Sequence, residues 1–132
     1  MVLEMNQHFR HGFVSQSGAE AFLAKPENLL FAAVFENEVI GFAFGYRLNR
    51  LDGGRTMLYI HELGVQEAYQ RQGIGLQMLR ALKQWCKENG VGKMFLTCYQ
   101  NNLGANKLYR KAGGEVSPES QGIDTVYFFP IY

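Results

Sequence analysis

The segment that most limits the possible folds of this chain is an amphipathic helix set between two apolar stretches. One helical face over residues 74–90 collects six apolar side chains: Ile74, Met78, Leu79, Leu82, Trp85 and Cys86. Gly90 is a typical helix terminator. The flanking apolar stretches, 57–65 and 94–99, have the length of strands. Because a strand, crossover helix and strand join two parallel strands, we predict a sheet with a parallel pair at its centre.

The remaining apolar runs predict antiparallel strands around that pair. Runs at 29–35 and 39–46 flank Glu36-Asn37-Glu38, and asparagine tolerates the positive φ of a tight hairpin turn. A helix is expected over 102–112, and a last strand over 124–129. The fold class is therefore α/β (or α+β), with a mixed, mostly antiparallel central sheet flanked by helices.

The chain is expected to form a single domain, residues 1–132. With 132 residues, of which 47% are apolar and 14% aromatic, it is long enough to bury one core but not two. Before the hairpin, weak helical periodicity covers residues 2–9, and Ser17 is positioned to cap a second helix over 18–25.

The net charge, hydropathy and cysteine content argue against a nucleic-acid-binding protein, a membrane-spanning protein and a secreted disulfide-rich protein. The net charge of +1 gives no nucleic-acid footprint, and no stretch approaches the length of a membrane span. Two cysteines, Cys86 and Cys98, are too few for a secreted disulfide framework, and the N-terminus does not resemble a signal peptide. We therefore expect reduced thiols and a cytoplasmic protein.

The strand expected over 57–65 places two acid–base candidates on opposite faces. Simple alternation puts Leu58, Ile60 and Glu62 on one face, with Met57, Tyr59, His61 and Leu63 on the other. Glu62 is then either a functional carboxylate or one paired at the sheet edge, and His61 is more typical of a hydrogen-bonded core or rim residue. A bulge is expected at Gly64.

A glycine-containing turn between this strand and the amphipathic helix predicts an anion site. Its residues are Gln70, Arg71, Gln72, Gly73, Ile74 and Gly75. Amide N–H groups at such a turn converge near the positive end of the helix dipole, which suits a phosphate or pyrophosphate. The alternative is a strand-to-helix turn without any ligand. Rossmann and P-loop sites are excluded because neither glycine pattern is present.

Two motifs together resemble the GNAT superfamily of N-acetyltransferases. Residues 63–65 and 69–75 are similar to its acetyl-CoA signature (Q/R-x-x-G-x-G/A). The second block, N-x-x-A-x-x-x-Y-x-x-x-G, is matched by Asn102, Ala105, Tyr109 and Gly113. The resemblance covers residues 29–132, and residues 58–65 with their flanks look most like the aminoglycoside 3-N-acetyltransferases.

The resemblance implies an acyl-CoA N-acyltransferase fold, with acetyl-CoA as co-substrate and no metal. The turn would hold the CoA pyrophosphate, while the backbone of Leu63, Gly64 and Val65 would pair with the pantetheine arm. The Val65 N–H would then face the thioester oxygen as an oxyanion donor. Asn102 would contact the CoA arm.

The same resemblance assigns two catalytic residues and a direct mechanism. Glu62 would accept the proton of the acceptor amine, directly or through a water molecule, and Tyr109 would protonate the departing thiolate. Attack in a ternary complex is expected because no positioned nucleophile argues for an acyl-enzyme, and Cys98 fits a buried, inert thiol. From its apolar helix face alone, Tyr109 is more typical of a core tyrosine with its hydroxyl at the rim.

Two departures from the family leave the acceptor and the assembly open. The strand that opens such folds has no counterpart here, which leaves an open edge and predicts a homodimer. Family members that acetylate aminoglycosides have acids where residues 99–102 and 127–130 are neutral here, so another small amine or a peptide amine is equally open. The alternatives to an enzyme are a non-catalytic acyl-CoA-binding module and a purely structural dimer.

Overall fold

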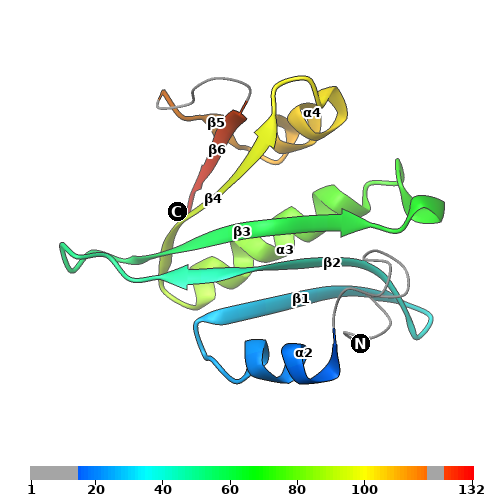
Figure 1. Ribbon diagram of the computed structural model, residues 1–132. Helices are drawn as coiled ribbons and strands as arrows, with labels where there is room; N and C mark the ends of the chain where they lie inside the picture. Colours follow the sequence, from blue (N-terminus) through cyan, green and yellow to red (C-terminus); the bar gives the residue numbers. More distant parts are fainter. Residues whose placement is uncertain (1–14, 119–123) are drawn as a thin grey trace.

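The computed structural model describes residues 15–118 and 124–132, which form one six-stranded sheet and its flanking helices (Figure 1). The elements in chain order are α2 (Gln16–Leu23), β1 (Asn28–Phe35), β2 (Glu38–Leu48), β3 (Thr56–Val65), the 3-10 turn η2 (Glu67–Tyr69), α3 (Ile74–Glu88), β4 (Val91–Tyr99), α4 (Leu103–Lys111), β5 (Glu115–Val116) and β6 (Asp124–Pro130).

The strand order is β1-β2-β3-β4-β6-β5, and β1 is the outermost strand on its side among the described residues. Strands β3 and β4 are parallel, and every other neighbouring pair is antiparallel. The expected mixed, mostly antiparallel sheet is therefore confirmed. The β1–β2 hairpin turns at Glu36 and Asn37, whose φ values are 49° and 65°.

Three details of the elements differ from the sequence prediction. Helix α2 begins at Gln16 and is capped by Ser15, whose Oγ accepts a hydrogen bond from the Gly18 N–H at 3.0 Å, so Ser17 is not the cap. The two-residue strand β5, expected as part of a polar loop, pairs with β6. The helix expected over 2–9 lies outside the described residues.

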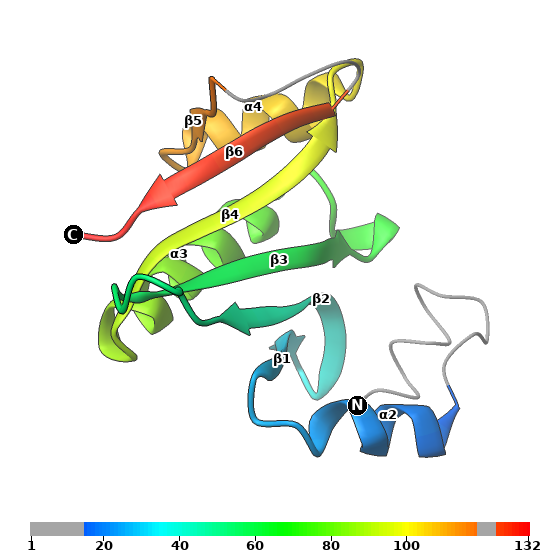
Figure 2. The same cartoon turned by 60° about the vertical axis from the view of Figure 1, so that its left-hand side comes forward.

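The main core lies between the sheet and helices α3 and α4. Its buried residues include Leu58 and Ile60 of β3, Leu79 and Leu82 of α3, and Tyr127 and Phe129 of β6. Figure 2 shows β3, β4 and β6 in front of both helices. On the opposite face, α2 packs on β2 through edge-to-face contacts of Phe22 with Phe44 and Tyr46.

A β-bulge at His61 changes which side chains of β3 face the core. In the β2–β3 ladder Phe44 is opposite Glu62, whereas the next residue, Gly45, is opposite Ile60, so His61 is the extra residue. Beyond the bulge, Leu63 and Val65 pack against the main core. The sequence prediction placed the bulge at Gly64 and Leu63 on the outer face; both were wrong because one extra residue reverses the alternation.

The parallel pair β3–β4 is short and then separates. Pairing covers four register positions and ends at Tyr59 opposite Phe95, although the strands continue to Val65 and Tyr99. Figure 1 shows the two strands diverging beyond this point. The second half of β3 therefore has a ladder partner on only one side among the described residues. None of the described helices combines the length and apolarity needed to span a bilayer.

Candidate active site

The backbone of the turn before α3 adopts the left-handed conformation twice. Arg71 has φ 63° and Gly73 has φ 82°. Such alternation brings successive N–H groups toward one point and forms an anion-binding concavity. Gly73 is the N-cap residue of α3, and no side-chain hydrogen bond caps this helix. The first-turn amides thus remain available to a ligand, and the exposed Arg71 adds a positive charge beside them.

The side chains of the neighbouring glutamines form hydrogen bonds within this turn, and Gly75 packs against α4. Gln70 Nε2 donates to the Val65 carbonyl at 2.9 Å, and Gln72 Nε2 donates to the Ala68 carbonyl at 3.2 Å. A Cβ on Gly75 would lie 3.0 Å from Leu108 Cδ2, so this glycine lets α3 approach α4 closely. Position 73 therefore needs glycine for its backbone conformation, whereas position 75 needs glycine for close packing.

The hydrogen-bond phase of the β2–β3 ladder fixes the direction of the Leu63 and Val65 amides. The Gln66 N–H donates to the Ile40 carbonyl at 2.8 Å. In an antiparallel ladder hydrogen-bonded pairs alternate with non-bonded ones, so the pairs Gly41–Val65 and Ala43–Leu63 are not bonded to each other. Their N–H and C=O groups on β3 point away from β2, toward the side where β3 and β4 separate. The Gln70 contact to the Val65 carbonyl agrees with this phase.

Gly64 lies between these two residues and has a packing function. A Cβ at this position would lie 2.7 Å from Phe42 Cε1 of the neighbouring strand. Since Phe42 is only 2% exposed and stacks on Phe44 at 6.4 Å, its ring has little room to move. Gly64 therefore lets β2 and β3 pair closely beside the two outward-pointing amides.

Glu62 lies on the face of the sheet away from α3, contrary to the sequence prediction. It is opposite Phe44 in the ladder, and directly opposite residues share a face. The His61 ring contacts Phe44 at 5.2 Å, so His61 and Glu62 lie on the same face. The bulge brings together two groups that alternation had separated. Glu62 is half-buried.

Tyr109 lies on the opposite face, inside the main core. It is 9% exposed, and its ring is 5.5 Å from that of Tyr127. Burial, together with Cys98 and Tyr127 nearby, raises the pKa of Tyr109 to about 12, so its hydroxyl is protonated at neutral pH. Burial also raises the pKa of the half-buried Cys98 thiol, which makes it a poor nucleophile.

Asn102 has a structural function that the sequence motif did not reveal. Its side-chain oxygen accepts a hydrogen bond from the Ala105 N–H at 3.1 Å and caps α4. The Asn106 side chain donates to the carbonyls of Tyr99 and Asn102, which ties the helix start to the end of β4. Asn102 thus positions α4, and with it Tyr109, relative to the diverging strand.

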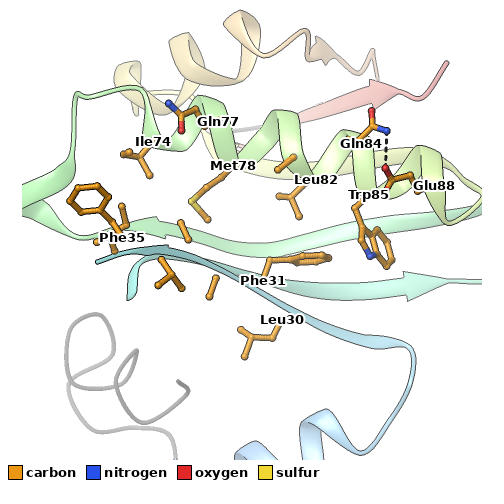
Figure 3. A pocket seen from close by; sticks show the side chains of 15 residues that line it. Leu30, Phe31, Phe35, Ile74, Gln77, Met78, Leu82, Gln84, Trp85 and Glu88 are labelled. Atoms are coloured by element: carbon orange, nitrogen blue, oxygen red, sulfur yellow. Dashed lines mark hydrogen bonds between the residues drawn. The ribbon is translucent and has the colours of Figure 1, made fainter. Parts of the chain in front are cut away.

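An apolar groove of about 800 Å³ lies elsewhere, between β1 and α3 (Figure 3). Phe31 and Trp85 meet edge to face at 5.4 Å along its wall, and Ile74, Met78 and Leu82 complete the α3 side. Sequence reasoning did not predict this groove, since it arises where β1 forms the outer edge of the sheet. Among the described residues, no group of three or more His, Cys, Asp or Glu side chains is arranged to hold a metal ion.

The parallel strands β3 and β4 separate, and a glycine-containing turn precedes the helix that connects them. This arrangement is the architecture of the acyl-CoA N-acyltransferases. Residues 2–114 match the Acetyltransferase (GNAT) family. The chain belongs to this family.

The curated relatives are named for acetylation of different acceptors. The chain is 34% identical over 94 residues to the N-alpha-acetyltransferase RimI of Mycobacterium tuberculosis, a match covering 69% of this chain and 54% of RimI. It is 28% identical over 109 residues to the spermine/spermidine N(1)-acetyltransferase of Bacillus subtilis, covering 79% of this chain and 68% of that protein. The match to N-acetyltransferase YobR of B. subtilis spans only 20% of YobR, so this chain aligns with part of such relatives.

Solved structures share the fold at lower identity. An aminoglycoside acetyltransferase, meta-AAC0020, from an uncultured soil metagenomic sample has a TM-score of 0.77 at 23% identity, covering 92% of this chain and 82% of that one. The PaiA N-acetyltransferase of Thermoplasma acidophilum, solved with coenzyme A, has a TM-score of 0.68 at 16% identity, covering 96% and 86%.

Proposed function

We propose that this protein is an acetyl-CoA-dependent N-acetyltransferase that transfers the acetyl group to a primary amine by direct attack in a ternary complex. The observation that carries the proposal is the direction of the Leu63 and Val65 amides, which point to the side where β3 and β4 separate. An extended pantetheine arm placed there would pair with β3 as an added strand, and the Val65 N–H would face the thioester oxygen.

The turn before α3 would hold the other end of the donor. The left-handed residues Arg71 and Gly73 aim backbone amides at one point, and the start of α3 adds its dipole. The pyrophosphate would bind these amides, with Arg71 as counter-charge. Relatives solved with CoA or acetyl-CoA support such a co-substrate.

The chemistry divides between the two faces of the sheet. Glu62, directly or through one water molecule, would accept a proton from the ammonium form of the acceptor. The freed nitrogen lone pair then forms a bond to the thioester carbon, the nitrogen releases its second proton to solvent, and the carbon–sulfur bond breaks. Tyr109, protonated at neutral pH, would donate its proton to the departing thiolate and regain one from solvent.

Calorimetric titration with acetyl-CoA and CoA, followed by thiol release across a panel of amines, tests this function. We expect binding of both donors and amine-dependent thiol release that falls about 10²-fold or more in Glu62→Gln and in Tyr109→Phe. Full activity in both variants would remove the proposed mechanism. Donor binding without transfer to any amine would instead favour a non-catalytic acyl-CoA-binding module.

The acceptor panel should span the amines named for the relatives. It includes an aminoglycoside, a polyamine and a peptide with a free N-terminus, since fold likeness alone does not choose among them. Aminoglycosides remain a candidate, although residues 99–102 and 127–130 supply none of the acids that would bind a polycation.

We also propose a homodimer in the cytoplasm. Strand β1 is the outer edge of the sheet among the described residues, and its apolar side chains continue into the groove against α3. An apolar open edge favours pairing with a second copy. Both cysteines are unpaired thiols, as expected in a reducing compartment.

A further inference from the structure

Basic side chains are unevenly distributed over the molecule and gather on the two helices of one face. Helices α3 and α4 carry six of the 13 lysines and arginines but only one of the 12 acids, Glu88. The rest of the chain, with seven basic and eleven acidic residues, is therefore net negative. Gln84 hydrogen-bonds Glu88 at 3.0 Å, and both line the groove against β1 (Figure 3). The acid of α3 thus lies on the side of the helix that faces β1.

Five of the six cations line the seam between the two helices. We call them the basic seam: Arg80, Lys83 and Lys87 of α3, with Lys107 and Lys111 of α4. The three cations of α3 are spaced as neighbours on one helix face, and they border a single hollow of about 280 Å³. Lys83 Nζ donates to the Ala112 carbonyl at 3.2 Å, which joins this row to the end of α4.

The two lysines of α4 adjoin the row on α3. Lys111 lies one helical turn after Leu108, the side chain that packs against Gly75 of α3, and Lys107 lies one turn before Lys111. Residues one turn apart are neighbours on a helix surface, so both lysines stand on the side of α4 that adjoins α3. The sixth cation, Arg110, is directed toward β4, where it acts electrostatically on Cys98.

Neighbouring acids do not neutralise the basic seam. Lys83 is half-buried, and the other four cations are exposed. Within residues 15–118 and 124–132, Arg50 and Asp52 form an ion pair, whereas none of the five seam cations has an acidic partner. Like charges on adjoining helix surfaces repel one another, and together they create a positive potential over this face although the net charge of the chain is only +1.

The basic seam begins beside the proposed donor site. Gly75, which Leu108 contacts, belongs to the turn that would bind the CoA pyrophosphate. From there the seam follows α3, with Arg80 and Lys87 about 8 and 18 Å along the helix axis from Gly75. Acyl-CoA carries about four negative charges at neutral pH, up to about two of them on its phosphate monoester. Since the Debye length is about 8 Å at physiological ionic strength, these cations attract an approaching donor before it reaches the turn.

We propose that the basic seam is a capture surface for the polyanionic donor. Its two cations farthest from the turn, Arg80 and Lys87, would accelerate the encounter with acyl-CoA by long-range attraction and would not hold the bound donor. Their effect would therefore appear in the association rate constant, kon, and not in the dissociation rate constant, koff. This inference rests on the proposed acetyltransferase function and adds how that site recruits its donor.

The test measures kon and koff by stopped-flow mixing of the full chain with a fluorescent CoA thioester at ionic strengths of about 20 mM and about 500 mM. The double variant Arg80→Gln/Lys87→Gln should lower kon about fivefold at the low ionic strength and less than twofold at the high one, with koff unchanged. Lys25→Gln/Arg55→Gln is the matched control. It removes the same charge from exposed positions outside the seam, and should lower kon less than twofold at both.

Equal losses of kon in the two double variants would overturn the inference, because net charge alone would then explain them. A higher koff with unchanged kon in the seam variant would also overturn it, since the cations would then touch the bound donor. Circular dichroism melting verifies that both variants fold like the native chain. Failure of the proposed function appears differently: the expected kinetics without thiol release to any amine would remove the transferase and leave the capture surface. A chain that does not bind CoA would remove both.

Discussion

Tyr109 is the proposed general acid, and its buried environment opposes ionisation of its hydroxyl. Its pKa of about 12 exceeds the value of about 8.5 typical of a thiol, so it is a weaker acid than the thiol it would protonate. Proton transfer from Tyr109 to a free thiolate is therefore uphill, and in the proposed mechanism the hydroxyl would hydrogen-bond the departing sulfur as the carbon–sulfur bond breaks. Burial thus keeps the hydroxyl in the protonated form throughout the neutral range.

The raised pKa of Tyr109 predicts loss of stability in alkali. The folded value, about 12, lies above the ordinary value of 10.0, so the unfolded chain loses this proton first. Stability is therefore complete below pH 10 and falls as the pH rises toward 12, by about 2 kcal/mol for this group. Urea denaturation at several pH values should show a shallower decline in Tyr109→Phe than in the native chain.

Tyr99→Phe is the control for this experiment, because the Tyr99 side chain is 60% exposed, and it should keep the native slope. Cys86, whose pKa burial raises to about 11, adds a decline from pH 9 that is common to all three proteins. If stability declines equally steeply with pH in Tyr109→Phe and in the native chain, the raised pKa described for Tyr109 is contradicted.

At the scale of elements, we expect the backbone conformation of the turn before α3 to control donor binding. Gly73→Ala forces a Cβ into the left-handed region at φ 82° and should destabilise the fold by about 1–2 kcal/mol while weakening acetyl-CoA binding about tenfold. Gly73→Asn should lose less of both, since asparagine tolerates this region. Chemical denaturation and calorimetry measure the two effects.

Gly104→Ala is a control in which the expected change in stability has the opposite sign. Gly104 lies inside α4, and a Cβ there would meet no atom within 4 Å. Alanine should therefore stabilise the helix by about 0.5–1 kcal/mol and leave donor affinity unchanged. Equal losses in Gly73→Ala and Gly73→Asn would show that the left-handed conformation is not what the donor requires.

The cap of α4 can be separated from the proposed contact of Asn102 with the CoA arm. Asn102→Ala removes the acceptor for the Ala105 N–H and should cost about 1 kcal/mol. Asn102→Asp keeps that acceptor, so stability should return to nearly the native value. Melting curves and acetyl-CoA titrations of both variants decide the matter: affinity that returns with stability in Asn102→Asp argues for capping alone.

Element type was predictable from sequence where periodicity was strong, as in α3, and where a turn had a residue that tolerates positive φ, as at Asn37. The face of Glu62 was not predictable, because nothing in the composition of residues 57–65 marks His61 as an extra residue. Strand β5 was missed because two residues carry no periodic signal. The phase of the Leu63 and Val65 amides depends on the pairing of distant strands, which sequence alone does not determine.

At the scale of the whole molecule, the sheet edge that β1 forms among the described residues predicts self-association. Val34 and Phe35 at the end of this strand are 55% and 51% exposed. Val34→Lys places a charge on the edge and should shift the protein to monomer, whereas Leu51→Lys, in the fully exposed β2–β3 loop, should not. Sedimentation velocity at two protein concentrations measures this. A native chain that is monomeric at both concentrations would contradict the dimer.

The short pairing between β3 and β4 also divides the sheet into halves that are contiguous in sequence. Strands β1–β3 come from the first half of the chain and β4–β6 from the second, and among the described residues four register pairs and the packing of α3 join the two halves. A chain cut between Val65 and Gly73 would separate β1–β3 from α3, β4, α4, β5 and β6, and would divide the main core between the two fragments. Because the proposed donor site includes Val65 on one fragment and Gly73 on the other, we expect reassembly of the two fragments to depend on the concentration of acyl-CoA.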